Sequence, residues 1–332
     1  MSICEQLADA SLTQLTFGAA PIGNLYAEVD EQEAVEAVEA AYQAGIRSFD
    51  TAPYYGFGLS ERRLGRALKG LARGSFSVST KVGRSLYDDA CSLGRGEGFA
   101  VDGVRARFDY SRDGILRSFE ASLERLGVDS VDVLLLHDIG QDTHGARHAE
   151  VLRQALDEAL PAMAELKAGG ACRAIGLGLN EEAAALAVMP HFDLDLVMLA
   201  GRYTLMEQSG SQALLAAAAV RGICILIAGP YNSGLLGPPD RPGTTYNYGE
   251  PDVATLLRAQ RFYDICARHG VDTGAAALQF PLAHQAVRSV VVGLRTAAEV
   301  QTSVRRFRAE IPASLWAALK FEGLLPAEAF TP

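Results

Sequence analysis

The pattern that most constrains the fold is a repeated unit, in which a short β-branched or aliphatic run and a loop precede a longer segment with apolar residues at helical spacing. Repetition of this unit is typical of a parallel sheet whose strands are joined by helices. Eight runs are predicted as strands: Leu15–Gly18, Ser48–Asp50, Phe76–Lys81, Val131–His137, Ala174–Gly178, Leu196–Leu199, Cys224–Ile227 and Val290–Val292. The predicted helices are Glu31–Ala44, Glu61–Leu68, Arg112–Leu126, Val151–Lys167, Glu181–Val188, Gln212–Val220, Val253–Arg268, Ala297–Phe307 and a final Pro312–Phe321.

This pattern predicts an α/β protein with one closed (β/α)8 barrel, a TIM barrel, as a single domain over residues 1–332. No Pro/Ser-rich linker divides the 332 residues, and the 49% that are apolar suffice for one large core. A doubly wound sheet is the alternative. It is disfavoured because no predicted strand leads through a G-x-G-x-x-G turn into a helix, as in a Rossmann domain.

Two connections, Gly83–Asp109 and Ala228–Asp252, are long for loops of a barrel. Both follow the carboxyl ends of predicted strands, where barrels build their active sites, so we expect both to contact substrate or cofactor. A disordered insertion is the alternative. Glu97, Phe99 and Tyr246 lie in these loops and are candidates for substrate contact without an assigned role.

Charge and composition restrict the partners. A formal net charge of −10 without a basic stripe argues against nucleic acid. The first residues lack the pattern of a signal peptide, and Arg221 interrupts the most apolar stretch, Ala213–Ala228, so we expect no membrane partner. Five cysteines without a C-x-x-C pair fit a reducing compartment. We therefore expect a cytoplasmic protein that acts on a small molecule.

Ionisable residues end three of the predicted strands: Asp50 in SFDTAPYYG, Lys81 in FSVSTKVG and His137 in VDVLLLHD. The carboxyl ends of barrel strands share one rim, so these side chains can meet there, and Tyr55 can reach them from the loop after Asp50. Each residue alone has a structural alternative: a turn cap for Asp50, a solvated strand end for Lys81, a core histidine for His137 and a packing aromatic for Tyr55.

Together, these residue types indicate proton transfer at a carbonyl or alcohol. A tyrosine is a poor base near neutral pH because its pKa is near 10, and a lysine ammonium within about 4–6 Å would lower that pKa. Asp50 would keep Lys81 charged and oriented, and His137 would hydrogen-bond the substrate oxygen or relay its proton. The set contains no redox centre, so a diffusible hydride carrier must supply it.

Four separated motifs resemble the aldo-keto reductases from Leu15 to Phe307: FDTAPYYGFGLSERRLG, STKVG, LLLHD and VVVGLRTAAEV. The resemblance implies a catalytic tetrad of Asp50, Tyr55, Lys81 and His137, with Tyr55 as acid or base. FDYSRDGILRSFEASLERLG and HDIGQDTHG look like the branch of L-fucose and D-threo-aldose 1-dehydrogenases, L-galactose dehydrogenase and pyridoxal 4-dehydrogenase. The resemblance to this branch implies oxidation of an aldose at C1 to the lactone with NAD or NADP.

The motifs that would bind the nicotinamide depart from the family pattern. IGLGLNE leaves Asn180 as the carboxamide ligand, and MLAGRY has Ala200 or Gly201 where the family has glutamine. Ala228 replaces the usual stacking aromatic, and Tyr231 and Tyr203 are the candidates to take its place. Ser233, in the same AGPYNSGLLG segment as Tyr231, is a further candidate cofactor contact.

The segment GLRTAAEV corresponds to the adenosine-side loop of the family, so Gly293, Arg295, Thr296 and Glu299 are candidate cofactor contacts. Glu299 replaces a cation that would bind the 2′-phosphate of NADP. A carboxylate there repels a phosphate and can accept a hydrogen bond from a 2′-hydroxyl, which favours NAD, whereas Arg295 offers a cation for NADP.

Three other functions stay open. One is a pyridoxal 4-dehydrogenase, or another alcohol dehydrogenase or aldehyde reductase of the same family. The second is a nucleotide-sensing barrel without turnover, and the third is a Schiff-base aldolase that uses Lys81. His144 and His148 have a metal-like spacing without a third ligand, so we expect no metal site. Arg62 and Arg63 are expected on a solvated helix face, and Asp138 is expected to order the following loop or form a turn.

Overall fold

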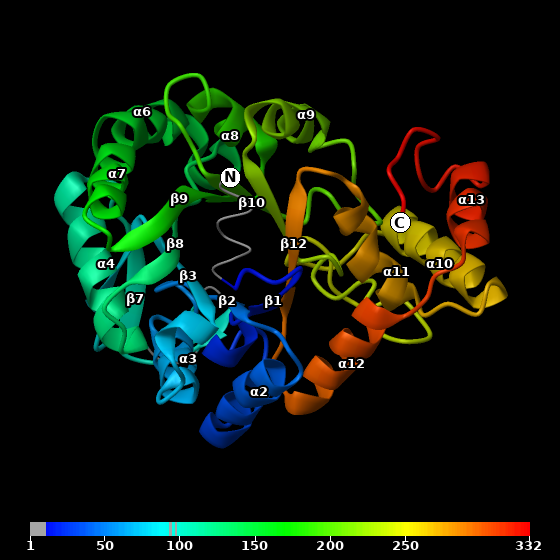
Figure 1. Ribbon diagram of the computed structural model, residues 1–332, viewed down its shortest axis with the longest axis horizontal. Helices are drawn as coiled ribbons and strands as arrows, with labels where there is room; N and C mark the ends of the chain where they lie inside the picture. The colour runs from blue at the N-terminus through cyan, green and yellow to red at the C-terminus, as the bar shows by residue number, and fades with distance from the viewer. Residues whose placement is uncertain (1–10, 93–94, 97) are drawn as a thin grey trace.

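The strands of the barrel form where the sequence predicts them. A computed structural model describes residues 11–92, 95–96 and 98–332. Eight parallel strands form a closed barrel in the order β1, β12, β11, β10, β9, β8, β3, β2. Helices surround this ring in Figure 1. The strands are β1 (Leu15–Gly18), β2 (Ser48–Asp50), β3 (Ser77–Val82), β8 (Val131–His137), β9 (Cys172–Leu179), β10 (Leu196–Ala200), β11 (Cys224–Ala228) and β12 (Val287–Gly293). The predicted (β/α)8 barrel is confirmed.

Two strands begin earlier than predicted. β9 starts at Cys172, which pairs with Val131, and β12 starts at Val287, which pairs with Ile225. An arginine near the start of each strand interrupts the apolar run, so the sequence pattern placed the first residues outside the strand. Pairing with the neighbouring strand nevertheless extends the ladder.

Side chains cap the starts of two helices outside the ring. Asp30 caps the first by accepting hydrogen bonds from Gln32 N and Glu33 N, and Ser111 caps α4 by accepting from Gly114 N. The helices that match the prediction to within two residues at each end are α2 (Glu31–Gln43), α3 (Leu59–Leu68), α4 (Arg112–Leu126), α8 (Glu182–Val188), α9 (Gln212–Arg221), α10 (Val253–Arg268), α12 (Ala297–Arg308) and α13 (Ala313–Phe321).

The predicted single helix Val151–Lys167 is divided. It consists of α6 (His148–Gln154), a π-helical turn over Ala155–Ala159 and α7 (Leu160–Ala168). Pro161 lies at the start of α7, and its ring would clash with the carbonyl four residues earlier, so the preceding turn widens. A further helix, α11 (Thr273–Gln279), escaped prediction because its first six residues are all buried and leave no polar face.

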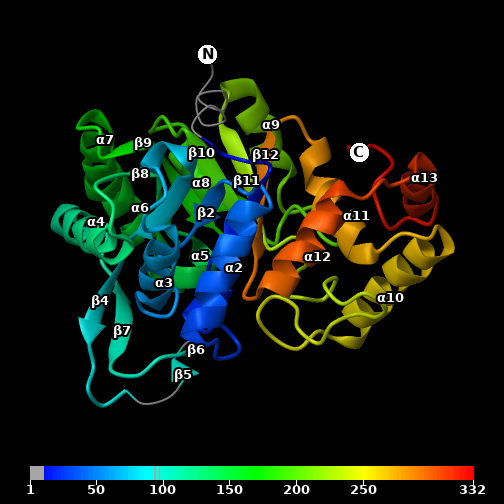
Figure 2. The same ribbon diagram turned by 60° about the horizontal axis from the view of Figure 1, so that its bottom comes forward.

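Both long connections have defined folds in the described residues. In the first, β4 (Arg84–Asp88) pairs with β7 (Val104–Phe108) as an antiparallel hairpin, and β5 (Arg95–Gly96) pairs with β6 (Phe99–Ala100). The hairpin projects from the barrel in Figure 2. Glu97 lies outside the described residues.

The second connection contains no helix or strand, but side chains tie it to the loop after β10. Thr204 Oγ1 donates to Asn232 Oδ1 at 2.8 Å, and the hydroxyl of Tyr246 donates to Glu207 at 2.6 Å. Tyr246 therefore makes a structural contact between the two loops. A disordered insertion does not describe these residues.

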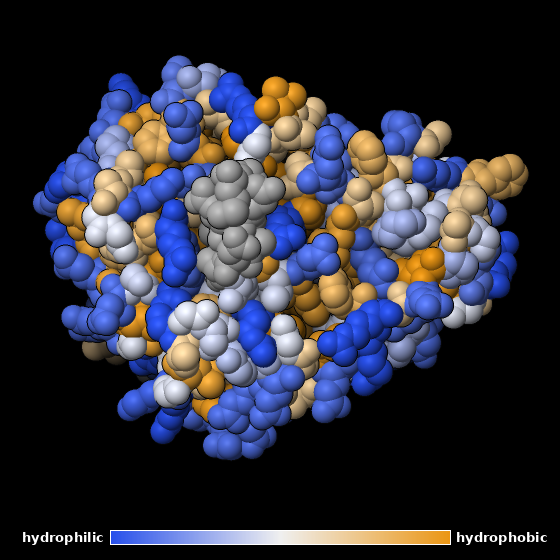
Figure 3. All heavy atoms as spheres, viewed as in Figure 1, coloured by the Kyte–Doolittle hydropathy of each residue, from blue (hydrophilic) through white to orange (hydrophobic). Residues whose placement is uncertain are grey.

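Apolar side chains fill the inside of the barrel and the layer between strands and helices. Figure 3 shows hydrophilic side chains interspersed with smaller apolar patches on one outer face. Arg62 is exposed as expected, but Arg63 is only 6% exposed because its guanidinium donates to the carbonyl oxygens of Ile22 and Val29. Among the described residues, no helix combines the length and apolarity that a membrane span requires.

Candidate active site

The candidate site begins with three neighbouring strands. Asp50 is the last residue of β2, His137 is the last residue of β8, and Lys81 is the penultimate residue of β3, which lies between them. Because these strands are parallel, all three side chains start from the same rim. Each residue is less than 10% exposed.

Lys81 and Asp50 form a buried ion pair. Lys81 Nζ lies 2.9 and 2.7 Å from the two carboxylate oxygens of Asp50, and it also donates to the carbonyl oxygen of Thr51 at 2.9 Å. Ser79 adds a hydrogen bond to the same carboxylate at 2.7 Å. The two opposite charges are therefore fixed next to one another, and each compensates the cost of burying the other.

Tyr55 completes the cluster from the turn between β2 and α3. Its ring centroid lies 4.7 Å from Lys81 Nζ and 6.0 Å from the centroid of the His137 ring, which it meets edge-on. Phe99 of the first long connection lies 6.3 Å from the Tyr55 ring. The four residues expected to act together are thus gathered at one place, and Phe99 lies beside the ring of Tyr55.

The protonation of Tyr55 differs from the expectation. Burial, with the carboxylates of Asp50 and Asp138, holds the pKa of Tyr55 well above its usual range, and Arg84 partly opposes this shift. The ammonium of Lys81 lies 4.7 Å from the centroid of the Tyr55 ring, but the carboxylate of Asp50 neutralises it at close range. The phenol is therefore a proton donor in this state, whereas base catalysis requires its ionisation.

His137 is neutral at physiological pH. Burial lowers its pKa to about 3, Arg84 and Lys81 add to this effect, and Asp138 opposes it. His137 Nε2 lies 3.4 Å from Asp138 Oδ2, whereas the buried Nδ1 meets no hydrogen-bond partner among the described residues. A neutral imidazole with its proton on Nε2 can donate a hydrogen bond to a substrate oxygen.

Three aromatic or cationic neighbours of the site were missed in the sequence. Arg84 of β4 forms an ion pair with Asp138 at 2.6 Å and lies 3.9 Å above the ring of Tyr54. The hydroxyl of Tyr110 bonds to the carbonyl oxygen of His137 at 2.9 Å. A signal for Arg84 existed, because it follows Lys81 by three residues and therefore starts from the same rim.

The candidate nicotinamide contacts fall into different environments. Asn180 follows β9 beside the cluster, where its amide donates to Asp138 Oδ1 at 3.4 Å. The ring of Tyr231 instead faces Arg306 of α12 at 5.4 Å, and Tyr203 is buried against Phe280. Ser233 Oγ accepts from Tyr248 N at 3.1 Å. Asn180 is therefore the candidate that lies next to the tetrad, through its hydrogen bond to Asp138.

The adenosine-side candidates form the start of α12. Gly293 ends β12 and is exposed, and Thr296 caps the helix by accepting from Glu299 N at 3.1 Å. Glu299 accepts from Arg295 N at 2.8 Å, and its other oxygen lies 3.2 Å from Arg295 Nε. The cation and the carboxylate that bear on cofactor choice therefore neutralise one another in this structure.

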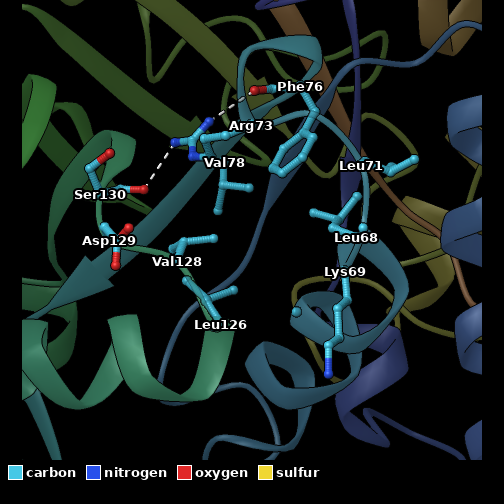
Figure 4. A pocket seen from close by; sticks show the side chains of 13 residues that line it. Leu68, Lys69, Leu71, Arg73, Phe76, Val78, Leu126, Val128, Asp129 and Ser130 are labelled. Atoms are coloured by element: carbon cyan, nitrogen blue, oxygen red, sulfur yellow. Dashed lines mark hydrogen bonds between the residues drawn. The ribbon is translucent and has the colours of Figure 1, made fainter.

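Two other kinds of site were considered. A pocket of about 290 Å³ in Figure 4 is lined by Phe76, Val78 and Ser130, so it lies at the amino ends of β3 and β8, opposite the tetrad. Arg73 crosses it and donates to backbone oxygens of Phe76 and Ser130, which is a structural role. Within the described residues, no cluster of three or more His, Cys, Asp or Glu side chains could hold a metal ion.

Comparison with known proteins identifies the class that this barrel and rim define. The model of the aldo/keto reductase family matches residues 14–320, and the chain belongs to this family. It is therefore an oxidoreductase of the class that uses nicotinamide cofactors.

Two curated enzymes and one solved structure are similar to this chain over nearly its whole length. The chain is 41% identical to a D-threo-aldose 1-dehydrogenase from Pseudomonas sp., with 96% of each protein covered. It is 38% identical to a pyridoxal 4-dehydrogenase from Microbacterium luteolum, with 95% of each covered. The holo form of an aldo-keto reductase from Bacillus halodurans has the same fold, with a TM-score of 0.72, 22% identity and 97% of each chain covered.

Proposed function

We propose that this protein is an NAD(P)-dependent aldose 1-dehydrogenase that oxidises a sugar at C1 to the lactone. The observation that carries the proposal is the convergence of Tyr55, His137 and the Lys81–Asp50 ion pair at one rim of the barrel. The similarity to a D-threo-aldose 1-dehydrogenase supports the choice of an aldose as the small-molecule substrate.

The residues divide the proton chemistry between them. His137 donates a hydrogen bond to the substrate oxygen, and the phenolate of Tyr55 accepts the proton of the anomeric hydroxyl while a carbonyl forms at C1. In the reverse direction the neutral phenol returns that proton. The ion pair of Lys81 and Asp50 keeps its two charges at a constant position beside Tyr55. A bound nicotinamide would supply the hydride acceptor that oxidation at C1 requires.

The residues present fit a dinucleotide. The amide of Asn180 lies beside the tetrad and offers a hydrogen-bonding partner for a carboxamide. Arg295, Thr296 and Glu299 lie at the amino end of α12, where backbone N–H groups favour a phosphate. We propose NAD as the preferred cofactor, because the carboxylate of Glu299 repels a 2′-phosphate and offsets the charge of Arg295.

The experiment is a panel of D- and L-aldoses, including L-fucose, L-galactose and D-arabinose, and pyridoxal, each with NAD and NADP. Formation of reduced cofactor with an equal amount of lactone supports the proposal. Turnover of pyridoxal alone would favour the second candidate, a pyridoxal 4-dehydrogenase, which the similarity to the Microbacterium luteolum enzyme supports.

Two functions from other classes are less well supported. A Schiff-base aldolase needs an uncharged lysine, but Lys81 is held by both oxygens of Asp50. Failure of borohydride and an aldehyde to label Lys81 would agree with this argument. A nucleotide-sensing barrel needs no tetrad, so cofactor binding without turnover of any substrate in the panel would favour it.

A further inference from the structure

Three polar side chains converge on the carboxylate of Asp138, the residue after His137. Arg84 Nη2 lies 2.6 Å from Oδ2. His137 Nε2 lies 3.4 Å from the same oxygen, and Asn180 Nδ2 donates to Oδ1 at 3.4 Å. The Asp138 side chain is only 7% exposed, so these neighbours replace water as its partners.

The backbone at Asp138 adopts a left-handed conformation. Its φ is 51°, in a region that aspartate and asparagine tolerate better than other residues with a side chain. Neighbouring groups hold it there, because the Tyr110 hydroxyl lies 2.7 Å and His144 Nε2 also 2.7 Å from the Asp138 carbonyl oxygen. These contacts fix the backbone of Asp138 and therefore the direction in which its side chain leaves the barrel rim.

Arg84 is itself fixed. Its guanidinium carbon lies 3.9 Å from the ring centroid of Tyr54 and 4.5 Å from that of Phe108, and its side chain is 13% exposed. A planar cation on aromatic faces loses little further freedom when it binds a carboxylate. The hairpin β4–β7 thereby supplies a rigid counterion for Asp138.

We propose that Asp138, clamped by Arg84, is a positioning residue that fixes the proton of His137 on Nε2 and the orientation of the Asn180 amide. The carboxylate favours a proton on the nearer imidazole nitrogen, and Nδ1 has no acceptor among the described residues. Donation from Asn180 Nδ2 to Asp138 leaves the amide oxygen of Asn180 available to a ligand.

Asp138 and Arg84 also shift the pKa of Tyr55, in opposite directions. Asp138 raises the pKa of Tyr55 and Arg84 lowers it. Removal of the Asp138 charge should therefore shift the alkaline rise of sugar oxidation to lower pH, and removal of the Arg84 charge should shift it to higher pH. The other titratable groups that face Tyr55 stay in place in both variants: Asp50, Lys81, His137 and Tyr248.

The test compares Asp138→Asn with Asp142→Asn, which removes a charge from an exposed residue nearby. Asparagine tolerates the left-handed backbone, so the first variant keeps the backbone while it removes the charge and replaces one acceptor oxygen by an amide NH2 group. ¹⁵N NMR of labelled histidine, with His137→Gln for assignment, should show one protonated ring nitrogen in the wild type and in Asp142→Asn. In Asp138→Asn the two nitrogen signals should move toward one another. Unchanged signals would overturn the proposal for His137.

Cofactor binding tests the role of Asn180. Titration of NADH and NADPH by fluorescence should give a dissociation constant roughly three- to tenfold higher in Asp138→Asn, the size of one misplaced hydrogen bond. Equal constants in the two variants would overturn this part. Only the cofactor and pH measurements rest on the proposed function. If the wild type binds neither dinucleotide, that function fails, and the NMR result still decides the proposal for His137.

A double variant distinguishes an electrostatic role of the Arg84–Asp138 pair from a purely structural role. Arg84→Met leaves the buried carboxylate without its cation, so Arg84→Met/Asp138→Asn should melt at a higher temperature than Arg84→Met alone. In addition, the pH profile of the double variant should lie between those of the two single variants. If both single variants shift the profile in the same direction, the electrostatic role of the pair is refuted.

Discussion

Separate removal of the two charges of the Lys81–Asp50 pair should destabilise the fold more than their joint removal. In Asp50→Asn, a buried ammonium loses both carboxylate contacts, at 2.9 and 2.7 Å, and keeps only the carbonyl oxygen of Thr51. In Lys81→Met, a buried carboxylate keeps only its neutral donors. A stranded charge of either kind costs about 3–5 kcal/mol.

A second estimate agrees with this magnitude. A stranded charge can gain or lose a proton, which at pH 7 limits its penalty to about 4–5 kcal/mol for an ammonium or a carboxylate. In the double variant Asp50→Asn/Lys81→Met neither charge is present, so its loss of stability should be smaller than that of either single variant.

The assay is urea unfolding followed by far-UV circular dichroism, with the four proteins compared at one pH. Equal slopes of the free energy of unfolding against urea concentration would confirm that the denatured states are comparable. The double-mutant cycle should give a coupling of at least about 3 kcal/mol, because the double variant loses less than either single variant. Additive losses in the double variant would refute the account of a mutually compensating buried pair.

Three other predictions concern protonation and the cofactor. Because the pKa of Tyr55 is raised and oxidation needs its phenolate, log(kcat/KM) for the aldose should rise with pH at unit slope, and a flat profile would contradict this. The unfolded imidazole of His137 binds a proton below pH 6.5 but the folded one only near pH 3, so falling pH favours unfolding in this window. In the wild type, His137 should lower the free energy of unfolding by up to about 1.4 kcal/mol for each pH unit below 6.5. His137→Gln should lack this contribution, as measured by urea unfolding at several pH values. Glu299→Gln removes the carboxylate paired with Arg295, so the ratio of kcat/KM with NADP to that with NAD should rise about tenfold, and an unchanged ratio would contradict the role of Glu299.

Local patterns were sufficient to predict the barrel, because each strand is a short apolar run and each outer helix has one buried face. They failed where tertiary contacts decide. The hairpin that carries Arg84 has half-exposed strands without a continuous apolar run, and α11 is too buried to show a polar face. Pro161 was visible in the sequence, but its effect on the preceding turn was not anticipated.

Within the site, the sequence predicted which residues meet but not their protonation. The rim position of Asp50, Lys81 and His137 follows from strand ends alone. The raised pKa of Tyr55 depends on its burial and on the distances to two carboxylates and a cation, which no spacing in the sequence encodes. The position of Tyr231 beside Arg306 likewise depends on how the loop after β11 packs against α12.

The most direct test of the account is Tyr55→Phe in rapid mixing with saturating NAD and the best aldose of the panel. The phenyl ring keeps the packing against His137 and Phe99 but removes the group that exchanges the proton. Hydride transfer should fall by about 10²- to 10⁴-fold while the dissociation constant of NAD stays the same. Lactone formation at the wild-type rate in this variant would contradict Tyr55 as the proton-transfer group and, with it, the proposed mechanism.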